Sequence, residues 1–570
     1  MAEVKEAKVE VSDELKPKIG DIEEQPSAPE EKPRGTRKVV RAVRIKKALT
    51  DKKKMKVTEI PPLASNEFEE IYFQDVWPPY AFVRVTMVTK TREYTYEVIE
   101  PKLTPEEKNI LDFTLNTMVD RIDFSRDENI SIEENQEKLR KLMNEIVNQS
   151  GKEITPLSRE KLFYYVIRKL MGYDKINVMM TDPMLEDISC DGVNLPLYVF
   201  HREFKNIKTN VMFNEHEELD NFVINLAQKS GKSISIADPV LDATLPDGSR
   251  LNETLGTEVT TRGSSFTIRK FKEDPLTVSD LVKSSTLSSA MAAHLWLAVQ
   301  FGESMICSGG TASGKTTTLN AISHFIPPSA KIITIEDTRE MNLPHENWVA
   351  GLTREKKGEE SGQSIDMFAL LTAALRQRPE YMIVGEVRGK ETMAVFQAMA
   401  TGQITYSTIH ADSVASIVHR LENPPINIPR ILILGLNVII LQAQVRVKGQ
   451  RTRRIKELVE VIGIEPTSNE IITNTVYKWI PSKDEFKYGG HSKLYEKIME
   501  RENLTAEEVL DEVDRRGKII VWMMKKGLRK HVEVASVINE YYREPKTVID
   551  RVNKELVDIE AKEAEEAANA

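Results

Sequence analysis

Cysteine is scarce in this chain of 570 residues, which contains only Cys190 and Cys307, far apart in the sequence. Neither belongs to a C-x-x-C pair, so a zinc site built from cysteines is excluded. Each cysteine lies beside an apolar run. This position predicts two buried free thiols in a reducing compartment.

Long hydrophobic runs are also missing. The longest one, Ile431 to Leu441, has eleven residues and includes Asn437, whereas a membrane-spanning helix needs about 20 apolar residues. The N-terminus, Met1 to Lys5, is charged and lacks the apolar segment of a signal peptide. We therefore expect an intracellular protein, which could still dock on a membrane protein.

The composition shows no large excess of positive charge. The formal net charge of −9 does not suggest a dedicated nucleic-acid binder. Hydrophobic residues make up 40% of the chain and charged residues 29%, as in ordinary globular proteins. A chain of this length exceeds what one hydrophobic core can organise, so we expect two to four domains.

The first 57 residues form a charged arm that we predict to be disordered, because it is rich in Glu, Lys and Pro and poor in large apolar groups. From Lys32 to Lys56 it holds twelve Lys or Arg residues and one acid, Asp51. Such a run is either a solvated arm or a contact for anionic lipid or an acidic partner.

Two regions that mix strands and helices follow the arm. Residues 58–171 are predicted to be a small α+β region, and residues 172–275 a sheet domain. The predicted strands are 80–88, 94–99, 183–192, 197–201 and 264–271, with a hairpin over 242–252 that turns at Asp247-Gly248. The predicted helices are 104–150, 159–171 and 216–233.

Residues 276–465 alternate between strand and helix, which predicts an α/β domain with a parallel sheet. Its strand candidates are 305–308, 331–336, 381–385, 404–408 and 455–461. Residues 466–553 are predicted to be mostly helical, with a capping box at Thr505 to Glu508 and a helix end at Gly527. Residues 554–570 are an acidic tail.

One loop carries the clearest chemistry. Residues 309–316 read GGTASGKT and fit G-x-x-x-x-G-K-[ST] between a strand and a helix. Glycines allow successive N–H groups to point at phosphate oxygens, and the helix N-terminus adds positive potential. Lys315 would reach the β- and γ-phosphates, and Thr316 would ligate Mg²⁺. The predicted nucleotide-binding residues are Gly309, Gly310, Thr311, Ala312, Ser313, Gly314, Lys315, Thr316 and Thr317.

Three further strand ends carry residues that should converge on this loop. Glu336 would polarise the attacking water, or Asp337 would help to hold it. Glu386 has the position of a Walker-B acid, which holds Mg²⁺ directly or through water. His410 is either a structural histidine or a sensor of the γ-phosphate. Taken singly, a strand-end acid is as well explained by capping.

Three arginines, Arg250, Arg262 and Arg269, precede the loop. They are either surface residues or, for one or two of them, charge-stabilising contacts to the γ-phosphate.

The order of these motifs resembles the secretion ATPase superfamily of type II secretion, type IV pili and type IV secretion. The matching segments are the phosphate loop 309–316, the Asp box 336–337, the Walker B pair 385–386 and the His box 408–412, within a similarity over about residues 175–465. The stretch from Glu336 to Trp348 is similar to the archaeal branch. Thr338 stands where bacterial pilus members usually have Pro, and the tetracysteine loop of many of those members is missing.

This resemblance implies a fold, a site and a machine. The fold would be a RecA-like P-loop ATPase domain with a parallel-rich sheet, preceded by a smaller α+β domain and flanked by helical segments. ATP and Mg²⁺ would bind between the two domains of each subunit in a homohexamer, with Arg250, Arg262 or Arg269 closing on the γ-phosphate. Ring motion would drive a polytopic membrane platform protein at the inner face of the cell membrane, with a regulatory ATPase-like protein as a further partner.

The regions before residue 175 and after residue 465 resemble the ATPase of the archaellum, which drives assembly and rotation of that filament. The alternative within the family is an archaeal pilus or protein-secretion ATPase. A RecA-like nucleic-acid motor is a third reading, but it would need basic and aromatic loops facing a pore, and we expect no specific nucleic-acid partner.

Overall fold

The computed structural model describes residues 57–63, 65, 67–121, 132–149, 151–152, 154–272, 274–354 and 364–569. The basic run from Lys32 to Lys56 lies outside the described residues. Within them, both cysteines are buried free thiols, as predicted. No helix in the described ranges is long and apolar enough to cross a membrane.

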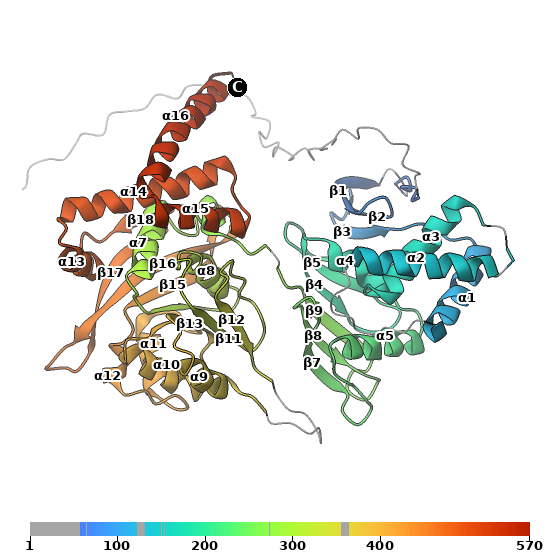
Figure 1. The fold of residues 1–570 in the computed structure, drawn as a ribbon, viewed down its shortest axis with the longest axis horizontal. Coiled ribbons are helices and arrows are strands. Elements are labelled where there is room, and N and C mark those ends of the chain that lie inside the picture. The colour runs from blue at the N-terminus through green and yellow to red at the C-terminus, as the bar shows by residue number, and fades with distance from the viewer. Residues whose placement is uncertain are drawn as a thin grey trace, which may run out of the picture. The chain divides into compact units, whose positions relative to one another are not determined.

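A first sheet of nine strands has the order β1-β2-β3-β6-β5-β4-β9-β8-β7 (Figure 1). Its strands are β1 (Phe68–Trp77), β2 (Ala81–Val88), β3 (Tyr94–Ile99), β4 (Leu185–Cys190), β5 (Pro196–His201), β6 (Lys205–Met212), β7 (Val240–Thr244), β8 (Arg250–Thr254) and β9 (Ser265–Arg269). Neighbouring strands are antiparallel, except that β3 pairs with β6 in parallel. Strands β1 and β6 were not predicted from the sequence.

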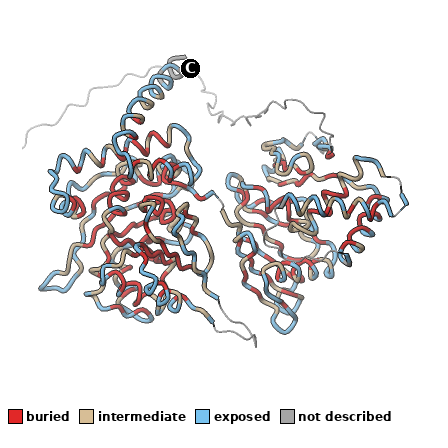
Figure 2. The backbone as a smooth tube through the Cα atoms, in the orientation of Figure 1, coloured by how far each residue is buried: buried red, intermediate tan, exposed pale blue. Residues whose placement is uncertain are grey.

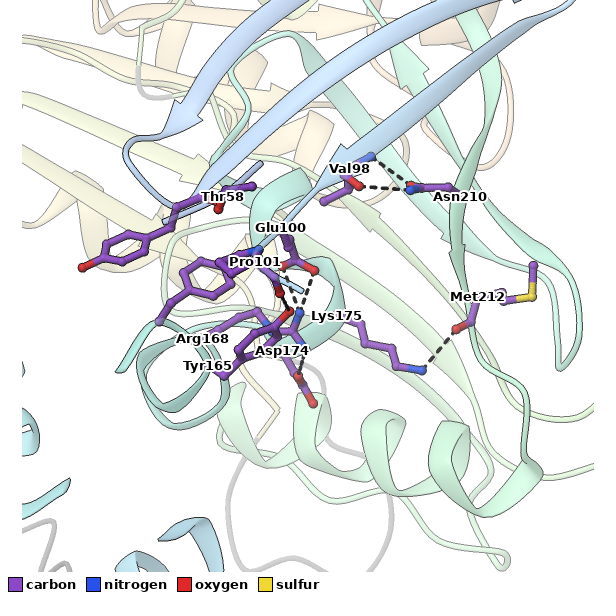
Figure 3. Close-up of polar contacts among 12 residues, drawn as sticks. Thr58, Val98, Glu100, Pro101, Tyr165, Arg168, Asp174, Lys175, Asn210 and Met212 are labelled. Carbon is purple, nitrogen blue, oxygen red and sulfur yellow. Dashed lines mark hydrogen bonds and ion pairs between the residues drawn. The ribbon is translucent and has the colours of Figure 1, made fainter. Parts of the chain in front are cut away.

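The boundary predicted at residue 171 does not separate two sheets, because β1–β3 and β4–β9 are one continuous ladder. Thr95 and Tyr96 of β3 are paired with Lys208 and Thr209 of β6. Beyond these pairs, the Asn210 side chain accepts from the Val98 N–H at 2.9 Å and donates to the Val98 carbonyl at 3.0 Å (Figure 3). A side chain thus extends the ladder where backbone pairing stops.

Three helices, α1 (Pro105–Arg121), α2 (Ile132–Gln149) and α3 (Pro156–Leu170), form their own apolar cluster. Arg168 near the end of α3 joins them to the sheet domain. Its guanidinium donates to Glu100 at 2.9 Å and to Asp174 at 3.0 Å (Figure 3). The short helices η1 (Asp174–Ile176) and α4 (Asn177–Thr181) follow, and α5 (His216–Lys229) packs into the core of the first sheet.

A second sheet of nine strands has the order β12-β11-β13-β14-β10-β15-β16-β17-β18. Its strands are β10 (Met305–Gly309), β11 (Ile332–Glu336), β12 (Trp348–Leu352), β13 (Tyr381–Glu386), β14 (Ile404–Ile409), β15 (Val438–Val447), β16 (Gln450–Ile464), β17 (Ile471–Ile480) and β18 (Glu485–Tyr488). The six strands from β12 to β15 are parallel, and the last three add antiparallel pairs. The α/β prediction with a parallel-rich sheet is confirmed.

The central strands of this sheet are buried on both sides, because helices cover both of its faces. Met305 and Cys307 of β10 face one core, and Ile306 between them faces the other. The first core takes α6 (Val278–Lys283), α7 (Ser289–Gln300), α8 (Lys315–Ser323), α13 (Lys493–Glu502), α14 (Ala506–Lys526), α15 (His531–Arg543) and α16 (Pro545–Asn569). The second takes α9 (Met367–Leu375), α10 (Glu391–Ala400), α11 (Val414–Glu422) and α12 (Arg430–Ile433).

The helices after residue 492 share the core of the second sheet. Trp296 of α7 stacks on Phe325 with 5.0 Å between the ring centroids, and it makes an edge-to-face contact with Tyr541 of α15 with 5.2 Å between the centroids. The capping box of α14 at Thr505 is formed as predicted, and Gly527 closes that helix in the left-handed conformation. Figure 2 shows buried stretches both in the strands of the sheet and in the helices packed against it. The acidic tail lies in α16.

Candidate nucleotide site

The loop after β10 is shaped by contacts that only glycine permits at two positions. A Cβ on Gly309 would lie 2.1 Å from the carbonyl oxygen of Gln442, in the neighbouring strand β15. Gly314 has φ +96° and is the N-cap of α8, a conformation that strains other residues. Ala312 also has a positive φ, of 58°. The sequence GGTASGKT therefore forms a tight loop that leads directly into a helix N-terminus.

Lys315 is the first residue of α8 and lies over the loop. Its ammonium group donates to the carbonyls of Gly309 at 3.1 Å and Gly310 at 3.2 Å. Burial lowers the pKa of Lys315, and the negative charge of Glu386 acts in the opposite direction. The cation is thus held at the mouth of the loop, close enough to Glu386 to feel its charge.

Glu336 ends β11 as a buried carboxylate, with 2% of its surface exposed. Its Oε1 accepts from the N–H groups of Glu340 and Met341, both at 3.0 Å. Its Oε2 is buried without a hydrogen-bond partner among the described residues. Burial raises the pKa of Glu336 to about 7, which suits a group that takes up a proton near neutral pH.

Glu386 ends β13 and is partly exposed, with 26% of its side chain accessible. It forms an ion pair with Arg388. The register between β13 and β14 shifts at Gly385, and the Thr408 hydroxyl donates to the Gly385 carbonyl at 2.8 Å. The hydrogen bond from Thr408 holds the backbone at this irregularity, directly before Glu386.

His410 follows β14 and is exposed. Its backbone carbonyl accepts from Arg420 of α11 at 2.9 Å. The next residue is held from β10, since the buried Ser308 hydroxyl donates to the Ala411 carbonyl at 2.7 Å. The backbone at His410 is therefore fixed on two sides.

The strand order explains why these residues gather. The strands β11, β13, β14 and β10 are consecutive neighbours and parallel. Glu336, Glu386, His410 and the loop all stand at the carboxyl ends of these strands, the edge where open α/β sheets bind their ligands.

The three arginines of the first sheet do not lie together. Arg250 of β8 and Arg269 of β9 are paired across the ladder, and both line a pocket that also includes Thr316 and Thr317. Arg262 lies beyond the other end of this ladder, where its carbonyl accepts from the Val193 N–H at 3.2 Å. The pocket thus includes Arg250 and Arg269, and not Arg262, together with the last residue of the phosphate loop and the residue after it.

Sequence reasoning missed two arginines near the loop. Arg339 lines the same pocket, and its guanidinium lies 5.2 Å from the Phe271 ring and 5.4 Å from the Trp348 ring. Arg453 of β16 donates from Nε to the Ala312 carbonyl at 3.1 Å. Arg339 stands beside the Asp box, so its position was a usable signal. Arg453 had none, because strand β15, which links β16 to β10, was not predicted.

No group of three or more His, Cys, Asp or Glu residues in the described ranges is arranged to hold a metal ion by itself. Magnesium at a nucleotide usually takes only one or two protein ligands, with phosphates and water completing the shell. Thr316 and Glu386 supply a hydroxyl and a carboxylate beside the loop. These hard oxygen donors fit the Mg²⁺ predicted from the sequence.

Comparison with known proteins shows which protein family the chain belongs to. Residues 193–543 match the family described as type II/IV secretion system protein. A relative from Methanocaldococcus jannaschii, itself uncharacterized, is 36% identical over 516 residues, which cover 86% of this chain and 92% of that protein. The chain belongs to the type II/IV secretion system family, and the secretion ATPase superfamily predicted from its motifs is confirmed.

Other relatives are bacterial. A probable conjugal transfer protein TrbB from Sinorhizobium fredii is 31% identical over 235 residues, covering 40% of this chain and 69% of that protein. Among solved structures, the pilus retraction motor PilT with bound ADP matches with a TM-score of 0.35 and 18% identity, covering 59% of this chain and 88% of that one.

Proposed function

We propose that this chain is a Mg²⁺-dependent ATP hydrolase. The observation that carries the proposal is the alignment of Glu336, Glu386 and His410 with the phosphate loop at the ends of four neighbouring parallel strands. A loop of inward N–H groups binds phosphates. A buried carboxylate with a pKa of about 7 and a partly exposed carboxylate beside Lys315 supply the other two needs of hydrolysis, a proton acceptor and a metal ligand.

Each residue then has a defined task. Lys315 neutralises the β- and γ-phosphates, and Thr316 and Glu386 hold Mg²⁺. Glu336 takes the proton of the attacking water, and His410 senses the γ-phosphate from the strand end next to β10. Arg250 and Arg269 approach the γ-phosphate from the first sheet, so that ATP binding draws the sheet domain and the ATPase domain together and hydrolysis releases them.

We further propose that the chain works as a homohexamer that powers assembly and rotation of an archaeal filament of the type IV pilus kind, the archaellum. This assignment rests on the resemblance of the regions before residue 175 and after residue 465 to the archaellum ATPase. The Methanocaldococcus jannaschii relative is similar over 86% of the chain but is itself uncharacterized. A membrane platform protein would receive the motion. A secretion or pilus ATPase is the second candidate, favoured by the conjugal transfer relative.

The first test is nucleotide turnover by the purified full chain. Lys315→Ala should abolish binding or hydrolysis of ATP, because the phosphate charge loses its partner. Lys331→Ala, which removes a lysine at the amino end of β11, is the matched control and should hydrolyse ATP at the wild-type rate. Unchanged turnover in Lys315→Ala would refute the assignment of the loop.

The second test concerns the oligomeric state of the chain and the filament that it serves. The mass of the particle formed with a non-hydrolysable ATP analogue should correspond to six chains, and a monomer under all nucleotide conditions would refute the ring. Archaellin genes beside the gene for this chain would support the archaellum. Prepilin genes with their protease would favour the pilus alternative.

A further inference from the structure

The hairpin of β15 and β16 is the most cationic described segment near the nucleotide site. From Arg446 to Lys456 it contains six Lys or Arg residues and no acid. One of them, Arg454, is buried and held by Asp484 at 2.8 Å, so its role is structural. Arg453 beside it is exposed and points to the phosphate loop instead.

Arg453 makes two contacts with the loop. Its Nε donates to the Ala312 carbonyl at 3.1 Å. Its stem lies against Gly314, where a Cβ would come within 3.1 Å of the Arg453 Cδ and 3.0 Å of the Gln442 Nε2. Two neighbouring strands therefore form a wall against which the loop is packed.

The bonded carbonyl belongs to a strained residue. Ala312 has φ 58°, in the left-handed region, which is sterically unfavourable for a residue with a Cβ. Such a conformation persists only where its surroundings hold it. The hydrogen bond from Arg453 to the Ala312 carbonyl is such a contact, and it comes from a strand outside the loop.

We propose that Arg453 is a positioning residue for nucleotide binding, which keeps the loop in its phosphate-receiving shape through the Ala312 carbonyl. The proposal rests on the proposed ATPase function. Because Arg453 acts through the Ala312 carbonyl, its loss should weaken ATP binding and leave the chemical step, carried by Glu336, intact at saturating ATP.

The central variant is Arg453→Met, which keeps most of the stem packed on Gly314 and removes the donor. Loss of one such bond should raise the dissociation constant of a fluorescent ATP analogue, and the KM for ATP, by about three- to tenfold. The turnover number at saturating ATP should stay within about twofold. Arg453→Lys should restore part of the affinity, because its ammonium group can reach the same carbonyl.

Arg451→Met is the matched control. Arg451 lies two residues away on the same strand face, is exposed, and is paired with Arg446 across the ladder. Its loss changes the charge of the hairpin equally. If it weakened ATP binding as much as Arg453→Met, the general field of the hairpin would be the cause and the positioning role would be refuted.

A double-mutant cycle with Ala312→Gly tests the strain directly. Glycine adopts a positive φ without steric cost, so Arg453→Met should have a smaller effect on affinity in the Ala312→Gly chain than in the wild type. Equal effects in both backgrounds would overturn the proposal. Absence of ATP binding in the wild-type chain would instead refute the proposed function, so the two failures are distinguishable.

Discussion

Replacement of Glu336 by Gln tests the predicted base and its burial at once. The amide keeps an oxygen that can accept from the N–H groups of Glu340 and Met341, so the local backbone should hold. It cannot take a proton from water. ATP should still bind, while turnover falls by about 10²–10⁴-fold, the usual contribution of a general base.

The pH dependence of wild-type turnover follows from the pKa of about 7 for Glu336. About a tenth of the carboxyl groups would be ionised at pH 6 and about nine tenths at pH 8, so the rate should rise close to tenfold across this range. The residual rate of Glu336→Gln should lack this rise. A wild-type rate that is flat between pH 6 and pH 8 would contradict the role of Glu336 as base.

The stability of the folded chain should change with pH in the direction opposite to the turnover rate. Folding raises the pKa of Glu336 from its ordinary value of 4.5 to about 7, so the folded chain holds this proton more tightly than the unfolded chain. The free energy of unfolding therefore falls as pH rises from about 4.5 to about 7, by roughly 3 kcal/mol in total. Glu336→Gln cannot ionise, so it escapes this loss.

Thermal unfolding measured at several pH values provides the assay. The melting temperature of Glu336→Gln should rise relative to that of the wild type as pH increases from 5 to 8, and level off above that. Glu346→Gln removes a charge from an exposed position and serves as the control without such a trend. A difference between Glu336→Gln and wild type that is independent of pH would refute the reasoning about burial.

Two further predictions concern the sheet domain and the arm. Arg250→Ala and Arg269→Ala should each lower kcat/KM for ATP about tenfold or more, as expected for arginines that stabilise the γ-phosphate. Arg262→Ala should leave kcat/KM unchanged. A loss of activity confined to Arg262→Ala would contradict the assignment. Deletion of residues 32–56 should leave the basal ATPase rate unchanged and abolish stimulation by vesicles of anionic lipid, an idea that equal stimulation of the deleted chain would discard.

Much of the fold and the loop could be predicted because the signals are local. An apolar strand followed by GGTASGKT identifies a phosphate-type loop from a short segment, and Thr505 caps its helix through atoms three residues away. Short apolar runs are a sequence signal for buried strands, and they allowed β10, β11, β13 and β14 to be predicted. Strand β6 carries few apolar residues, and its place in the sheet depends on pairing with β3 and β5.

The sequence by itself determined the nucleotide chemistry: a phosphate loop, a carboxylate after each of two apolar strands, and a family order of motifs. Tertiary structure decided which of these groups lie together. Sheet order placed Glu336, Glu386 and His410 beside the loop, and the β8–β9 ladder separated Arg262 from Arg250 and Arg269. Arg453 reaches Ala312 across 141 residues of chain, because strand pairing brings distant segments together and no local pattern encodes that contact.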